Sequence, residues 1–116
     1  MARKHIVYSY KMMDADTMAA DITSDVVEVS QMDSAAILVE WTATTPNGVL
    51  EVYARHGDAG TWYLLDFNST ITVTATNSFV QILLNSLPFT HVKLFYDRTS
   101  GTGSMTATIT AKTAGG

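Results

Sequence analysis

Apolar and polar residues alternate one by one over several stretches of this 116-residue chain. The clearest are TITVTAT at 70–76 and SMTATITAK at 104–112, where every second residue is apolar and threonine fills most of the places between. Similar apolar faces run through 78–84 and 91–98. Successive side chains of a strand point to opposite faces of its sheet, so this pattern predicts half-buried β-strands.

Turn-forming residues divide the chain at short intervals, among them Pro46-Asn47-Gly48, Gly57 to Gly60, Asn77-Ser78 and Thr99 to Gly103. No segment shows convincing helical periodicity. We predict nine strands, near 4–11, 25–29, 35–43, 48–56, 61–66, 70–76, 78–84, 91–98 and 104–112. Many short strands without helices indicate an all-β protein, an antiparallel β-sandwich of jelly-roll-like or immunoglobulin-like form.

One domain is expected over residues 1–116, because the chain has the length of one domain and no linker composition or internal repeat. Residues 1–33 are predicted to form an amino-terminal strand and arm. Within them, the segment 13–25 fits a loop, a short helix capped by Asp14 or Asp16, or an arm that packs on a neighbouring chain.

Composition narrows the class of protein. Apolar residues make up 47% of the chain and charged residues 16%, which is typical of a soluble globular protein. There is no cysteine, so stability must come from the core or from association with other chains. The amino terminus lacks the apolar stretch and cleavage site of a secretory signal, so we expect synthesis in the cytoplasm. No apolar run is long enough to span a membrane, so no membrane partner is expected.

Charge argues against nucleic acid as a partner. The formal net charge is −4, and the segment between Lys11 and Arg55 holds eight acidic residues and no basic one. Phosphate backbones are bound by clustered lysine and arginine, and an acidic surface would repel them.

The sequence offers weak candidates for metal binding, and we predict neither a metal site nor a cofactor. His5, His56 and His91 fall on different predicted elements without paired spacing, so a surface or interface position is expected for each rather than zinc ligation. The four aspartates of the segment 13–25 could supply oxygen ligands to calcium, but their spacing does not fit a calcium-binding loop, and a solvated loop is favoured.

No set of catalytic groups is recognisable, and we expect a protein that is not an enzyme. A carboxylate pair for glycoside hydrolysis need only meet in space, but most acidic residues fall in predicted loops or on polar strand faces. The segment SGTGS at 100–104 lacks the strand–turn–helix setting of a nucleophile elbow or phosphate loop. We interpret it as a hairpin turn between the strands at 91–98 and 104–112.

The apolar strand faces predict a core that includes Trp41, Val52, Ile82 and Leu94. A second group of residues is expected to contact neighbouring chains, because methionine adapts to irregular interfaces and aromatic residues are enriched in them. This group consists of Met12, Met13, Met18, Met32, Trp62 and Tyr63. Trp62 and Tyr63 should point to opposite faces, so that one fills the sandwich and the other is left for an interface or for a sugar ligand.

The order of motifs over residues 37–112 resembles that of small virion structural proteins of bacteriophages, of the minor structural or decoration type. In that pattern a strand that ends in Trp is followed by G-x-L-x-V, by G-x-W-Y-x-L, and then by L-P-x-x-x-V-K-L-x-Y-x-R-x-S-G-T-G before the last strand. The residues that carry the resemblance are Trp41, Gly48, Leu50, Val52, Gly60, Trp62, Tyr63, Leu65, Leu87, Pro88, Val92, Lys93, Leu94, Tyr96, Arg98, Ser100, Gly101, Thr102 and Gly103. The first 35 residues do not share it.

The resemblance implies a non-enzymatic protein of the virion, such as a capsid decoration, fibre or minor structural component, that contacts other virion proteins and itself. A homotrimer is the first expectation and a dimer the second; the preference for three copies comes from the resemblance. The alternative is a carbohydrate-binding β-sandwich module that uses Trp62 or Tyr63 as a platform for a sugar ring.

Overall fold

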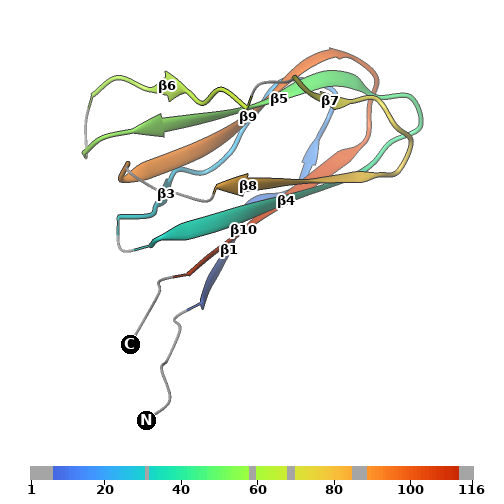
Figure 1. Ribbon diagram of the computed structural model, residues 1–116. Coiled ribbons are helices and arrows are strands. Elements are labelled where there is room, and N and C mark those ends of the chain that lie inside the picture. The colour runs from blue at the N-terminus through green and yellow to red at the C-terminus, as the bar shows by residue number, and fades with distance from the viewer. Residues whose placement is uncertain (1–6, 31, 58–59, 68–69, 85–88, 113–116) are drawn as a thin grey trace.

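The computed structural model describes residues 7–30, 32–57, 60–67, 70–84 and 89–112, and every structural statement below refers to these residues. They form two antiparallel β-sheets packed face to face, with no helix, as Figure 1 shows. No described segment is therefore a helix long and apolar enough to cross a membrane. The strands are β1 (Val7–Thr17), β2 (Ile22–Thr23), β3 (Val27–Glu28), β4 (Ser34–Thr42), β5 (Asn47–Arg55), β6 (Tyr63–Leu64), β7 (Ile71–Val73), β8 (Phe79–Leu84), β9 (His91–Ser100) and β10 (Ser104–Lys112).

Sheet A has the strand order β1-β10-β4-β8, and sheet B has β9 and β5 at its centre. On one side of sheet B, β2 and β3 both pair with β9; on the other side, β6 and β7 both pair with β5. The strands β2 and β3 can be counted as one interrupted strand, and so can β6 and β7. Each sheet then has four strands, and strands that follow one another in the chain nearly always lie in different sheets. Of the two expected arrangements, this order is the jelly-roll-like one.

The core lies between the sheets and follows the alternation seen in the sequence. In β10, Met105, Ala107, Ile109 and Ala111 are buried, and β4 and β5 show the same two-residue burial pattern. The four residues predicted for the core, Trp41, Val52, Ile82 and Leu94, are all buried. The indole N–H of Trp41 donates to the carbonyl oxygen of Ala75 at 2.7 Å, so its one polar atom is satisfied there.

The segment predicted as a loop, helix or arm is part of the sandwich instead. Strand β1 continues to Thr17 and pairs with β10 along its length, with shifts of register between Lys11 and Met13 and between Met13 and Asp16. Ala15 in the second of these bulges has a φ of 52°. Each bulge adds residues to one strand only, so the regular alternation is lost in this part of the sequence.

The glycine-rich segment 101–103 is not the hairpin turn that we predicted. It joins β9 to β10, and these strands lie in different sheets. Gly101 has a φ of 92°, and a side chain there would place its Cβ 2.9 Å from Cα of Pro46. The chain therefore turns between the two sheets with a backbone conformation and a close approach that suit glycine.

Tyr96 is fully buried at the centre of the sandwich, where its ring lies against Gly48. Its hydroxyl has no hydrogen-bond partner among the described residues. Burial raises the pKa of Tyr96, and Asp21 raises it further, whereas Arg98 lowers it. A buried hydroxyl without a partner costs about 1–3 kcal/mol.

We expect Tyr96→Phe to keep the fold and to raise the free energy of unfolding at neutral pH by about 1 kcal/mol, because it removes this buried hydroxyl. The raised pKa means that the folded state holds the tyrosine proton more tightly than the unfolded state does. Stability should therefore be full below the ordinary tyrosine pKa of about 10 and should fall as the pH rises through it. Urea unfolding at pH 8 and pH 11 measures both effects, and the loss at pH 11 should be smaller in Tyr96→Phe. A destabilised variant at pH 8 would show that the hydroxyl has a stabilising partner.

Candidate functional site

Three of the six residues predicted for an interface belong to the core. Met12, Met13 and Met18 are 2%, 1% and 0% exposed within the single chain. The interface prediction is wrong for them, because β1 is bound to β10 and the bulges turn two consecutive methionines inward. Met32 is partly buried and packs against the same core.

Trp62 and Tyr63 are the predicted interface residues that reach the surface. Tyr63 is 59% exposed on β6, at the edge of sheet B, and Trp62 is partly buried. Neither fills the space between the sheets, so the prediction that one of them would do so is wrong. Tyr63 and Leu64 pair with β5, while Trp62 packs against Arg55 of β5 and Lys93 of β9 and not against the residues of the core.

Trp62 forms a cluster on the outer face of sheet B. The guanidinium of Arg55 lies 4.6 Å from the centre of the indole ring, and the ammonium of Lys93 lies 4.4 Å from it. Lys93 is also 5.9 Å from the ring of Tyr53. Burial, followed by the charge of Glu51, raises the pKa of Tyr53, whose hydroxyl donates to Glu51 at 3.2 Å. Two cations therefore lie against the indole within the single chain, at distances typical of cation–π contacts.

The two described histidines, His56 and His91, differ in their burial. His91 is buried rather than on a polar surface, and its Nδ1 lies 2.7 Å from the hydroxyl of Thr90. It lies on the central strand β9, between Glu28 of β3 and Arg55 of β5 in the sheet register, so neighbouring strands cover it. His56 is exposed, and His5 lies outside the described residues.

The acidic residues of the amino-terminal segment are dispersed. The carboxylate of Asp14 lies 3.6 Å from Lys11. Asp21 accepts a hydrogen bond from the backbone N–H of Arg98 at 2.8 Å, and Asp25 accepts one from the hydroxyl of Tyr10 at 2.6 Å. Within the described part of the chain, no three histidine or acidic side chains are grouped in a way that could hold a metal ion.

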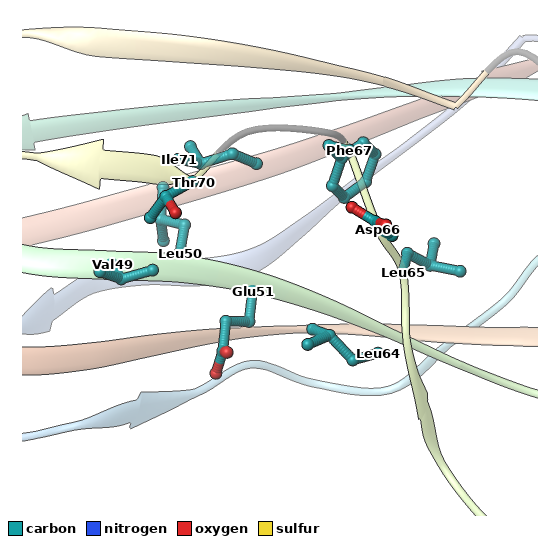
Figure 2. Close-up of a pocket in the computed structure, with 9 residues that line it drawn as sticks. All are labelled: Val49, Leu50, Glu51, Leu64, Leu65, Asp66, Phe67, Thr70 and Ile71. Carbon is teal, nitrogen blue, oxygen red and sulfur yellow. The ribbon is translucent and has the colours of Figure 1, made fainter.

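An open hollow of about 510 Å³ lies beside β5, where β6 and β7 leave a gap in their pairing with it. Its lining is mostly apolar, from Val49, Leu50, Leu64, Leu65, Phe67 and Ile71, with Thr70 and two carboxylates, Glu51 and Asp66. Figure 2 shows that Glu51 and Asp66 do not point toward one another. The hollow offers apolar surface and separate carboxylates, which can bind a partner group but do not form an acid–base pair.

A second hollow, of about 540 Å³, lies on the outer face of sheet A. Its central lining comes from Ala36, Leu38, Gln81, Leu83, Thr108 and Thr110, on β4, β8 and β10. No acidic side chain lines it, and Lys112 at one end is the only charged one. This hollow is therefore weakly charged, with a lining of apolar, small and threonine side chains.

Taken together, these observations define a jelly-roll-like β-sandwich with two shallow, largely apolar surfaces. The search against protein-family models gave no match, and the search of curated proteins gave none either.

Solved structures with a similar fold do exist. One is the crystal structure of the SPBc2 prophage-derived protein YomS, with a TM-score of 0.59 and 15% sequence identity over 97% of this chain and 98% of that one. Another is a chain in the structure of infectious bursal disease virus, Gx strain, with a TM-score of 0.58 and 14% identity. The alignment covers 97% of this chain but only 34% of the viral one. At such low identity the likeness shows the fold.

Proposed function

We propose that this protein is a non-enzymatic structural component of a bacteriophage virion and acts through contacts with other virion proteins and with itself. The observation that carries the proposal is the end-to-end match of its sandwich to a prophage-derived protein, with a viral protein sharing the same fold. The resemblance of residues 37–112 to phage structural proteins supports it independently. The surface supports it as well, because the hollows offer apolar and threonine-rich lining for protein contacts.

Association with particles tests the proposal. Phage particles purified by density gradient from a culture that carries the gene should contain the protein, and an antibody raised against it should label them. A decoration role predicts labelling over the whole capsid surface. A fibre role predicts labelling on projections, and a minor structural role predicts labelling at one site per particle. Protein that stays entirely in the soluble fraction while particles form would contradict a virion role.

We further propose a closed homo-oligomer, with three copies as the first expectation from the resemblance and two as the second. Identical chains commonly close with rotational symmetry, and closure leaves no open sheet edge to propagate fibres. Light scattering at tens of micromolar gives the mass. One chain is 12.6 kDa, so a mass of one chain would contradict self-association.

A further inference from the structure

Within the described part of the chain, strand β8 lacks the features that protect the free edges of the other outer strands of the two sheets. In sheet B the outer strands are very short: β2, β3 and β6 have two residues each and β7 has three. In sheet A, β1 is interrupted by two shifts of register and carries Lys11, Asp14 and Asp16. Short edges, bulges and charges are the means by which proteins prevent an edge from pairing with another chain.

Strand β8 reads FVQILL and contains neither charge nor proline. It pairs with β4 in unbroken register from Ala35 with Leu84 to Glu40 with Phe79, and no described strand pairs with its other side. Two large apolar side chains on its outer face are open to solvent, Phe79 at 66% and Leu83 at 57%. Leu38, which pairs with Gln81 from the neighbouring strand β4, lies on the same face and is 37% exposed.

We infer that β8 pairs with β8 of a second copy of this chain around a two-fold axis, which joins the two A sheets into one continuous sheet. The inference rests on the self-association proposed above and names one of its contacts. Two uncharged strands meet without opposing like charges, and a two-fold pairing uses the free edges of both copies and leaves neither open.

The side-chain pattern of β8 selects the register. In an antiparallel pair related by this axis, outward-facing residues oppose outward-facing residues. Centring the axis at Gln81 places Phe79 of each copy opposite Leu83 of the other and the two Gln81 amides opposite each other. Centring it at Ile82 would place Phe79 beyond the end of the partner strand. The register at Gln81 therefore buries both exposed apolar side chains, as aromatic–aliphatic cross-strand pairs.

This contact accounts for the proposed dimer by itself, whereas an isolated homotrimer has no two-fold axis and does not contain it. If it is the only contact, the protein is a dimer of about 25 kDa, twice the chain mass of 12.6 kDa. If a three-fold contact also exists, the two together give six chains.

Cysteine cross-linking tests the register, since the natural chain has no cysteine. In Gln81→Cys the two introduced side chains face each other from Cα atoms about 4.5–5.5 Å apart, a separation that a disulfide can span. Mild oxidation of the purified variant should give mostly cross-linked dimer on a non-reducing gel. Leu83→Cys alone should not cross-link, because its equivalents lie about four residues apart along the strands, roughly 13 Å. Phe79→Cys combined with Leu83→Cys should cross-link.

Thr72→Cys, on the exposed edge strand β7, is the matched control for random collision. A dimer yield for Gln81→Cys no higher than for this control would overturn the inference, and cross-linking of Leu83→Cys alone would overturn the register. An extended segment of another virion protein on β8 would give the first of these results.

Gln81→Lys provides a second test that needs no cross-linking. It should lower the mass measured by light scattering at least two-fold, because it brings two like charges together at the axis, while Thr72→Lys should leave the mass unchanged. Circular dichroism checks that both variants stay folded. An unchanged mass for Gln81→Lys would overturn the inference. Because these measurements use purified protein, they fail or succeed independently of the association with phage particles.

Discussion

Removal of residues 1–24 is expected to prevent folding. The deletion takes away β1 and β2, and with them Met12, Met13 and Met18, which are all at most 2% exposed. Burying one methionine side chain stabilises a fold by about 1.5–3 kcal/mol, so three account for a large part of the roughly 5–15 kcal/mol of a whole domain. The deletion also exposes the β10 edge that β1 covers. Circular dichroism and resistance to proteolysis measure the outcome.

Two point variants on β1 separate the loss of core packing from other effects of the deletion. Met13→Asp places a carboxylate at a position that is 1% exposed and should unfold much of the protein, because a buried charge without a partner is costly. Asp14→Asn changes the exposed neighbour on the same strand and should stay within about 0.5 kcal/mol of the natural chain. A folded Met13→Asp protein would contradict the placement of β1 in the sheet. It would also reopen the possibility that this segment contacts another chain.

The parts of the fold that could be predicted from the sequence are those with regular alternation. In β10 the two-residue pattern predicts both the bounds of the strand and its buried face. This is possible because the side chains of one face pack into the core, whereas those of the other face are partly or fully exposed. The same holds for β4 and β5, to within one residue at each end. Alternation is a reliable guide where a strand pairs on both sides without a bulge in its interior, and the one register shift of β5 lies at its first two residues, Asn47 and Gly48.

The errors arise where the pattern depends on pairing between distant segments. Met12 and Met13 are adjacent and both buried, which no regular strand allows, and only the register with β10 shows that bulges permit it. The glycines at 101 and 103 suit a hairpin and a connection between sheets equally well, so composition could not distinguish the two. Burial of His91 depends on β3 and β5 covering its strand from both sides.

The candidate surfaces were harder to predict than the core. Trp62 was identified as an exposed aromatic candidate, but its role depends on Arg55 and Lys93, which come from two other strands. The edge at β8 is visible in the sequence as a short uncharged strand, FVQILL, yet only the strand order places it at the rim of a sheet. A residue's face can be read from alternation, whereas the neighbours of a strand follow from the topology.

Leu94→Ala is expected to lower the free energy of unfolding by about 2–5 kcal/mol. Leu94 is fully buried on β9, opposite Val52 of β5. Its backbone N–H donates to the hydroxyl of Ser24 at 2.8 Å, and its carbonyl oxygen accepts from the N–H of Ser24 at 2.9 Å. The substitution keeps these backbone bonds, so the loss measures side-chain packing and the cavity left behind.

Leu64→Ala is the matched control, since Leu64 is 53% exposed on the edge strand β6 and should change stability by less than about 0.5 kcal/mol. Urea unfolding measures both variants. The midpoint should fall for Leu94→Ala with an unchanged slope, because the amount of surface exposed on unfolding stays nearly the same. Protein concentration must be held constant, because self-association adds to apparent stability by mass action. Equal effects of the two substitutions would mean that the Leu94 side chain does not point into the core. The register of β9 with β5 would then differ from the one described above.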